Sequence, residues 1–212
     1  MNRIPFPPMT RPLIAILRGL KPAETEDVVG ALIETGFTAI EIPLNSPEPF
    51  RSIGTAVKLA PDGVLIGAGT VLTVEDVDRL ADVGGTLMVS PNVEPDVIAR
   101  AAEKGMVTMP GVFTPTEALA AARAGATGLK FFPASVLGPA GIQAIRAVLP
   151  AELEIAAVGG VSEKNFSDYA AIGVRSFGLG SSLYKPGMAA AEVRARAEAT
   201  IAAYDAAYGV SR

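Results

Sequence analysis

The feature that most constrains this chain is a regular alternation of short apolar runs with longer amphipathic segments. Eight such runs begin about 19 to 26 residues apart, and each has the length of a β-strand. They start at Leu13, Ala39, Val64, Leu87, Met106, Gly128, Glu154 and Ser176. Because the runs are almost continuously apolar, the strands are expected to be buried on both faces and therefore parallel.

The segments between the runs carry the start and stop signals of helices. Thr73 lies three residues before Asp76, close to a capping box, and another segment stops at Gly36, a typical position for a helix C-terminus. A further helix is expected to begin at Ser162, and the longest one to extend from Ala189 to Ala207. Strand therefore alternates with helix along the whole chain.

Eight strand–helix units in 212 residues predict an α/β protein with a single (β/α)8 TIM barrel. An open doubly wound sheet is the alternative, but no run is followed by the G-x-G-x-x-G pattern of that class. The length suits one barrel domain over residues 1–212. Residues 1–12 are expected to form an N-terminal tail or a plug across the barrel bottom.

Composition excludes several classes of partner. The net charge of −4 and the absence of a basic run argue against nucleic acid. No apolar stretch approaches the ~20 residues that a membrane span needs. The proline-rich start has no apolar core of a secretory signal, so we expect a cytoplasmic protein without membrane contact.

The chain contains neither histidine nor cysteine. This removes the commonest general base, thiolate chemistry and the usual zinc sites. Any reaction must therefore use lysine, arginine, acidic or hydroxyl side chains, backbone groups, or a metal bound by oxygen alone.

Few ionisable side chains interrupt the predicted strands. Arg18 and Glu41 fall toward the carboxyl ends of the first two runs, and Lys130 lies within the sixth, whereas Glu154 and Arg175 fall at the opposite end. Active sites of (β/α)8 barrels lie at the carboxyl ends of the strands. The three charges fit either a structural ion-pair network or an active site, and we favour the active site.

Lys130 stands in the apolar run "GLKFFPAS". Alternation along the strand predicts that Phe131 points outward and that Phe132 shares the interior face with Lys130. Burial lowers the pKa of a lysine, and the neutral amine can attack a carbonyl to form a Schiff base. With Glu41 as proton shuttle and Arg18 for a substrate carboxylate, this chemistry is that of a class I aldolase acting on an α-keto acid.

Two glycine-rich turns follow the last two predicted strands, at Val158–Ser162 and Gly178–Ser182. Glycine lets backbone N–H groups approach an anion closely, and this pair of loops often binds phosphate in (β/α)8 barrels. Tight strand–helix turns alone would also explain either glycine pair. Both turns together favour a phosphate site. Combined with the keto group expected at Lys130 and the carboxylate expected at Arg18, this predicts a small-molecule substrate that carries all three groups.

The chain resembles a known family through motifs spread from residue 12 to about residue 184. In order they read "PLIAILRG", "EIPLNSP", "IGAGTVL", "KFFPAS", "AVGGV" and "GLGSSLY". Together they are similar to the bacterial keto-deoxy-phosphogluconate/phosphogalactonate aldolases. The resemblance implies a class I pyruvate aldolase on a (β/α)8 barrel, a homotrimer, and a reaction that needs no metal or other cofactor.

The resemblance also implies roles for individual residues. Lys130 would form the Schiff base, Glu41 would move protons, and Arg18 and Thr70 would hold the pyruvyl end of the substrate. The phosphate would lie among Gly159, Gly160, Gly180 and Ser181.

Two motifs favour the galactonate branch of this family. The gluconate-type enzymes carry "TGG" and "TLRTP", where this chain has Val158 before the paired glycines and Pro43 and Asn45 after Glu41. Ser135 likewise departs from the "KFFPAE" of the gluconate branch. Val158 is therefore the candidate for stereoselectivity, since an apolar side chain replaces a hydroxyl near the substrate diol.

The expected reaction is cleavage of 2-dehydro-3-deoxy-6-phosphogalactonate to pyruvate and D-glyceraldehyde 3-phosphate. The alternatives are the aldolase for the epimeric 2-dehydro-3-deoxy-6-phosphogluconate and an enzyme of dual specificity. More remote alternatives are a phosphosugar isomerase, epimerase or decarboxylase, and a sugar-phosphate-binding barrel without catalysis, because the fold hosts many functions.

Overall fold

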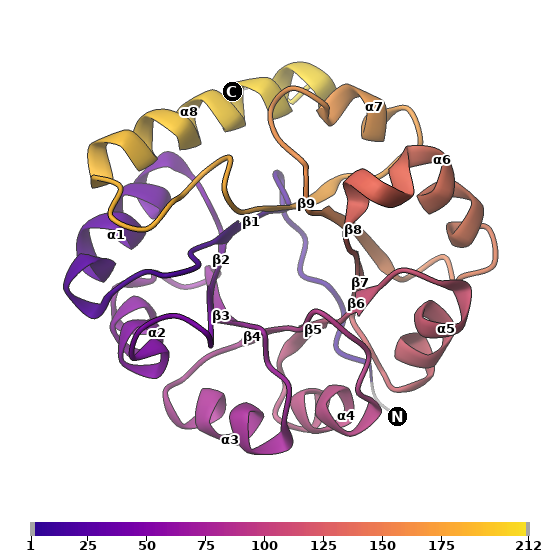
Figure 1. Ribbon diagram of the computed structural model, residues 1–212, viewed down its shortest axis with the longest axis horizontal. Helices are drawn as coiled ribbons and strands as arrows, with labels where there is room; N and C mark the ends of the chain where they lie inside the picture. Colours follow the sequence, from indigo (N-terminus) through magenta and orange to yellow (C-terminus); the bar gives the residue numbers. More distant parts are fainter. Residues whose placement is uncertain (1–2, 211–212) are drawn as a thin grey trace.

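A computed structural model describes residues 3–210, in which parallel strands form an inner ring surrounded by helices (Figure 1). The strands are β1 (Leu13–Ile16), β2 (Ala39–Pro43), β3 (Leu65–Gly69), β4 (Leu87–Val89), β5 (Val107–Met109), β6 (Gly111–Val112), β7 (Gly128–Phe131), β8 (Glu154–Val158) and β9 (Ser176–Leu179). They pair in the order β5-β4-β3-β2-β1-β9-β8-β7-β6. Each begins within a few residues of a predicted run.

The fifth predicted run forms both β5 and β6, because Pro110 interrupts it. Proline has no N–H to donate to a neighbouring strand. Its carbonyl still accepts a hydrogen bond from the Lys130 N–H at 3.0 Å, which ties the interruption to β7. Since β5 pairs with β4 and β6 with β7, this one run closes the ring. The predicted (β/α)8 barrel is confirmed, and the open sheet is excluded.

Eight α-helices of the described chain surround the strands (Figure 1). They are α1 (Thr25–Thr35), α2 (Pro49–Leu59), α3 (Val74–Asp82), α4 (Pro95–Glu103), α5 (Pro115–Arg123), α6 (Ala134–Arg146), α7 (Phe166–Ala170) and α8 (Ala190–Tyr208), with a short 3-10 helix, η1 (Pro22–Glu24), before α1. Two helix ends predicted from the sequence are confirmed. The Thr73 side chain accepts a hydrogen bond from the Asp76 N–H at the start of α3, and Gly36 ends α1 in the left-handed conformation. None of the helices between residues 3 and 210 has both the length and the apolarity that crossing a membrane requires.

One predicted helix start is wrong. The helix expected from Ser162 begins only at Phe166. The Asn165 side chain accepts the Ser162 N–H at 3.0 Å and donates to the Gly160 carbonyl at 3.0 Å. The asparagine therefore holds residues 160–165 as a turn, and the helix can start only after it.

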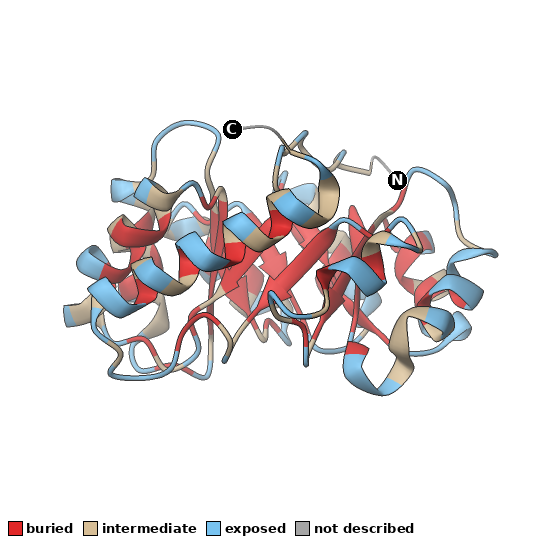
Figure 2. Cartoon of the chain, turned by 90° about the horizontal axis from the view of Figure 1, so that it is seen from above, coloured by how far each residue is buried: buried red, intermediate tan, exposed pale blue. Residues whose placement is uncertain are grey.

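Apolar side chains pack in two layers, one on each side of the strands. The outer layer fills the space between strands and helices and includes Phe131, as alternation along β7 predicted. The inner layer fills the barrel and includes Ile14, Val89, Met109 and Val158. Seen from the side, the strands form a buried middle layer, and the helices expose one face (Figure 2).

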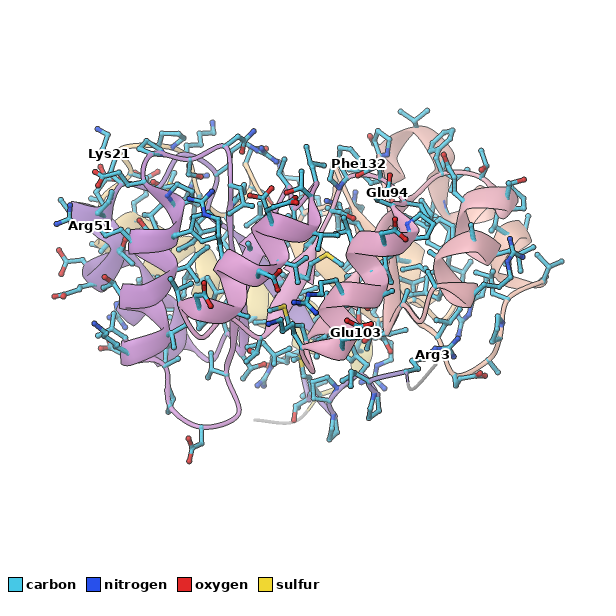
Figure 3. The ribbon with its side chains drawn as sticks, turned by 90° about the horizontal axis from the view of Figure 1, so that it is seen from below. Arg3, Lys21, Arg51, Glu94, Glu103 and Phe132 are labelled. Carbon is cyan, nitrogen blue, oxygen red and sulfur yellow. The ribbon has the colours of Figure 1, made fainter. Side chains whose placement is uncertain are left out.

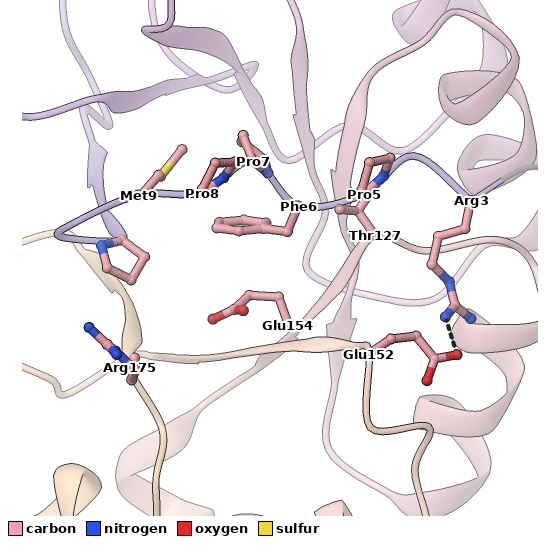
Figure 4. A pocket seen from close by; sticks show the side chains of 11 residues that line it. Arg3, Pro5, Phe6, Pro7, Pro8, Met9, Thr127, Glu152, Glu154 and Arg175 are labelled. Carbon is pink, nitrogen blue, oxygen red and sulfur yellow. Dashed lines mark hydrogen bonds and ion pairs between the residues drawn. The ribbon is translucent and has the colours of Figure 1, made fainter.

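The N-terminal segment crosses the bottom of the barrel, where Phe6 and Met9 pack against the inner layer. Beneath it lies a cavity of about 610 Å³ lined in part by Glu154 and Arg175, with an Arg3–Glu152 ion pair at its rim (Figure 4). The tail or plug expected at residues 1–12 includes residues 1 and 2, which lie outside the described range. Nothing in this cavity belongs to the carboxyl ends of the strands.

Candidate active site

The three charged residues singled out in the strands meet at the carboxyl end of the barrel. Glu41 lies on β2 and Lys130 on β7, while Arg18 lies two residues beyond β1. Figure 3 shows the end of the molecule that carries Phe132 opposite the end that carries Arg3. Glu41 and Lys130 line one small inner cavity, whose remaining walls are Ile14, Ile16, Val89, Met109, Val158 and Gly178. Two ionisable groups thus share a space that is otherwise apolar.

The Lys130 side chain is held in this apolar space with only 8% of the residue exposed. Burial lowers the pKa of its ammonium group, and the nearby positive charge of Arg18 lowers it further, whereas Glu41 opposes the shift. The ammonium lies over the Phe132 ring, 4.9 Å from the ring centroid. Phe132 therefore lies on the same side as Lys130, with its aromatic face toward the ammonium.

Glu41 is buried more completely, at 2% exposure. Burial raises the pKa of its carboxyl group to about 7, although the charges of Lys130 and Arg18 and the Gly69 backbone amide act in the opposite direction. Its Oε2 atom is buried without a hydrogen-bond partner in the described structure. A carboxyl group with a pKa near neutrality and a free oxygen is suited to take up and release a proton.

Gly69 is a residue of the site that the sequence analysis missed. A Cβ atom built on it would collide with the Glu41 carboxylate, which fills the space beside the last residue of β3. β2 and β3 pair in parallel with Glu41 opposite Gly67, so Gly69, two residues further along β3, lies on the same face as Glu41. Only a glycine leaves this space free for the carboxylate. The second glycine of "GAGT" was the sequence feature that could have indicated this contact.

Arg18 is exposed, and its Nη1 atom donates a hydrogen bond to Asn45 Oδ1 at 2.6 Å. Asn45 was noted in the sequence as a departure from the gluconate pattern, not as a partner of Arg18. The guanidinium is close enough to influence the pKa values of both Glu41 and Lys130. Arg18 is not among the described residues that line the inner cavity.

Thr70 follows β3 in a left-handed conformation, with φ of 56°. This conformation is uncommon for a residue with a branched Cβ. The preceding residues Ile66 and Ala68 belong to the outer layer. Thr70 is half-buried and is not among the described residues lining the Glu41–Lys130 cavity.

The four residues expected to hold phosphate lie together around a second cavity of about 160 Å³. Gly159, Gly160, Gly180 and Ser181 contribute to its wall, with Ser182 and Phe132 beside them. Gly159 and Gly160 both have positive φ values, 90° and 78°, which only glycine adopts easily. Ser135 packs against Gly160, and its N–H donates to the Gly159 carbonyl at 2.9 Å.

The two cavities adjoin, because Ile16, Val158 and Gly178 line both of them. Val158 is therefore at the junction between the amine–carboxyl pair and the glycine turns. The arrangement can hold an extended molecule with a reactive carbonyl at one end and an anionic group at the other. A buried amine with a lowered pKa, a carboxyl group with a raised pKa and a guanidinium are the kinds of group that act on such a carbonyl.

Comparisons with known proteins agree with this arrangement. A curated protein of Rhizobium meliloti (strain 1021), "Probable 2-dehydro-3-deoxy-6-phosphogalactonate aldolase", is 83% identical over 99% of both chains. The "2-dehydro-3-deoxy-6-phosphogalactonate aldolase" of Escherichia coli (strain K12) is 48% identical over 91% of this chain and 94% of its own. A solved structure described as "Native KDPGal structure" superposes with a TM-score of 0.93 at 46% identity, covering 96% of this chain and 98% of the other.

The family described as "Aldolase: KDPG and KHG aldolase" matches residues 9–200, which includes every residue of both cavities. An aldolase family accounts for a buried amine beside a proton-transfer carboxyl better than an isomerase or a binding protein does. The chain therefore belongs to the KDPG and KHG aldolase family, a family of carbon–carbon lyases.

Proposed function

We propose that the protein is a class I aldolase that cleaves 2-dehydro-3-deoxy-6-phosphogalactonate to pyruvate and D-glyceraldehyde 3-phosphate. The observation that carries the proposal is the pair formed by Lys130 and Glu41 in one apolar cavity at the carboxyl end of the barrel. The pKa of the lysine is lowered and the pKa of the carboxyl is raised, so a neutral amine and a proton donor can coexist near neutral pH.

The reaction follows from these two groups. The neutral Lys130 amine attacks the C2 ketone to give a carbinolamine. Glu41 donates its proton to the departing hydroxyl, so that loss of water leaves a protonated imine and a Glu41 carboxylate. Removal of the proton from the C4 hydroxyl releases the aldehyde, and the electrons of the C3–C4 bond move into the imine to give an enamine. Glu41 takes up the hydroxyl proton and then protonates C3 of the enamine. Water hydrolyses the resulting protonated imine, which frees pyruvate and the Lys130 amine and returns the released proton to Glu41.

The other residues hold the ends of the substrate. Arg18 binds the C1 carboxylate, helped by Thr70, while the C6 phosphate lies among Gly159, Gly160, Gly180 and Ser181. Support for the second assignment comes from the glycine cavity, which adjoins the cavity of Lys130 and is walled by all four residues. The covalent imine supplies the electron sink, so we propose that no metal or other cofactor is required.

The galactonate epimer is preferred over the gluconate epimer for two reasons. Both curated relatives described above are named for the galactonate compound. Val158 also presents an apolar side chain at the junction of the cavities, where a substrate hydroxyl would pass. An apolar wall discriminates against a hydroxyl only modestly, so some turnover of the gluconate epimer is expected.

Borohydride reduction tests the reaction class. Wild-type protein incubated with pyruvate and borohydride should carry a reduced pyruvyl adduct at Lys130, identified by peptide mass spectrometry. Lys130→Ala should abolish both the adduct and aldol cleavage, whereas Lys58→Ala, an exposed lysine on α2, should leave both unchanged. Absence of an adduct on the wild-type protein, or loss of activity with EDTA, would count against a class I aldolase.

An assay coupled to pyruvate detection tests the substrate. The galactonate epimer should give the higher kcat/KM, and equal values for both epimers would establish dual specificity instead. The same assay identifies a gluconate-specific enzyme if the order is reversed.

We propose further that the chain is one barrel domain, works in the cytoplasm and assembles as a homotrimer. Exposed apolar side chains at Leu72, Phe113, Phe132 and Val136 support self-association, because all four follow the carboxyl ends of strands. Light scattering on the purified protein tests the trimer directly.

A further inference from the structure

Arg18 reaches the site from a turn rather than from a strand. β1 ends at Ile16, and the next residues carry the guanidinium beyond the strand end. An exposed arginine on a turn has many side-chain conformations, and fixing one of them has a substantial entropic cost. Neighbouring residues must therefore hold the Arg18 side chain if it is to bind a substrate carboxylate in a defined geometry.

Two neighbouring residues beyond β2 hold this turn. Asn45 accepts a hydrogen bond from Arg18 Nη1 at 2.6 Å, so the amide fixes one corner of the guanidinium. The buried hydroxyl of Ser46 accepts the Gly19 N–H at 2.9 Å and fixes the backbone of the next residue. Pro186 closes the other side, since a Cβ on Gly19 would meet its ring.

The remaining donors of the Arg18 guanidinium are left for a ligand. Arg18 takes part in no ion pair between described residues, whereas Lys21 and Arg51 each pair with a nearby glutamate. A neutral amide orients an arginine without neutralising its charge, whereas a carboxylate partner would compete with the substrate. Because its partner Asn45 is neutral, Arg18 keeps its full positive charge for a substrate carboxylate.

We propose that Asn45 is a positioning residue, which orients the Arg18 guanidinium toward the carboxylate of the α-keto acid. This rests on the proposed aldolase function and adds to it a residue with no contact to the reacting carbon. Because the carboxylate is present in both ground state and transition state, loss of the orientation weakens binding more than turnover. Asn45 is exposed, so replacing it leaves the core intact.

The test measures imine formation by borohydride trapping at increasing concentrations of pyruvate or pyruvamide, which has the same keto group without the carboxylate charge. Asn45→Ala should raise the half-saturating pyruvate concentration about fivefold, and Arg18→Ala about tenfold or more. The maximal trapping rate of Asn45→Ala should change little, because the Arg18 charge is still present in that variant. With pyruvamide, Asn45→Ala should match the wild type, whereas Arg18→Ala should keep only the change that follows from removing its charge beside Lys130. Arg51→Ala, an exposed arginine on α2, is the control for loss of a surface charge.

The double variant Arg18→Ala/Asn45→Ala decides whether Asn45 acts through Arg18. If it does, the double variant should resemble Arg18→Ala alone, since coupled residues give non-additive effects. Additive losses, an equal loss with pyruvamide, or an unchanged Asn45→Ala variant would each overturn the inference while the aldolase assignment stands. Failure of the wild type to form any imine would instead overturn the proposed function, and the inference with it.

Discussion

The carboxylate of Glu41 occupies the space in which a side chain at Gly69 would lie. In the parallel pairing of β2 and β3, Glu41 lies opposite Gly67, so Gly69, two residues further along β3, is on the same face of the sheet as Glu41. The Leu44 N–H donates to the Gly69 carbonyl at 2.8 Å and extends this pairing. The position of the Glu41 carboxylate thus depends on the absence of a side chain on the neighbouring strand. The same absence lets the carboxyl turn into the barrel toward Lys130.

Replacing Gly69 with alanine should displace Glu41 and slow catalysis. The new methyl group would collide with the carboxylate, and a misplaced proton shuttle should lower kcat on the order of a hundredfold. Steady-state kinetics with the galactonate substrate measure this. Gly30→Ala is the matched control, because a Cβ there meets nothing within 4 Å and helix α1 should gain stability. Unchanged kcat in Gly69→Ala would mean that the carboxyl does not need its observed position.

The barrel could be predicted because its signal is repeated along the whole chain. Each apolar run gave a strand, and the interruption at Pro110 altered only how one run is divided. The start of α7 was missed because it depends on one side chain, Asn165, folding back on the turn before it. Such a local hydrogen bond competes with helix formation and leaves little trace in an apolar pattern.

The charged residues of the site were also visible in the sequence, since Lys130 and Glu41 are ionisable groups within apolar strands. Gly69 and Asn45 were not assigned to the site, because their roles come from contacts between different strands. Thr70 follows β3 with a left-handed backbone, which breaks the two-residue period of the strand and which the apolar pattern does not reveal. Register and turn conformation, rather than composition, determine these positions.

Glu41 should make the protein less stable as pH rises. Its folded-state pKa of about 7 lies above the usual value of 4.5, so the folded protein binds this proton more tightly than the unfolded chain does. The stabilisation is therefore complete below the unfolded pKa and is lost as pH rises through 7. Glu41→Gln removes the titration, and its stability relative to wild type should increase by about 2 to 3 kcal/mol between pH 5 and pH 8.

Urea unfolding at several pH values measures this difference. Lys130 adds to this difference. Because Glu41 opposes the lowering of the Lys130 pKa, that pKa falls further in Glu41→Gln, and the folded variant gains more stability than the wild type as pH rises. Glu198→Gln, which removes an exposed carboxylate on α8, should follow the wild type throughout. A constant difference between Glu41→Gln and wild type would contradict the raised pKa.

Gly180→Ala should weaken phosphate binding without affecting the imine. A Cβ at this position meets no atom within 4 Å, so the fold should accept it, and the methyl group would lie beside the cavity that Gly180 lines. Steric blocking of the backbone should raise the KM of the phosphorylated substrate about tenfold, the equivalent of one hydrogen bond to a charged group. Borohydride trapping with pyruvate, which has no phosphate, is the internal control. Equal losses with both compounds would place the phosphate elsewhere.

Val158→Thr should shift the preference between the two epimers. Val158 is 5% exposed and lines both cavities, so a hydroxyl placed there would face the middle of the substrate. Threonine has nearly the same shape as valine, and the gluconate-type enzymes carry threonine before their paired glycines. A site that can bond a hydroxyl discriminates more strongly than an apolar wall.

The ratio of kcat/KM for the gluconate epimer to that for the galactonate epimer should therefore rise about tenfold in Val158→Thr, the value of one hydrogen bond gained by the first epimer. The coupled pyruvate assay measures both values on one preparation. Val148→Thr makes the same chemical change at an exposed site beyond α6 and should leave the ratio unaltered. A ratio that stays the same in Val158→Thr would show that stereoselectivity arises from other residues, because the hydroxyl would then have no substrate atom within reach.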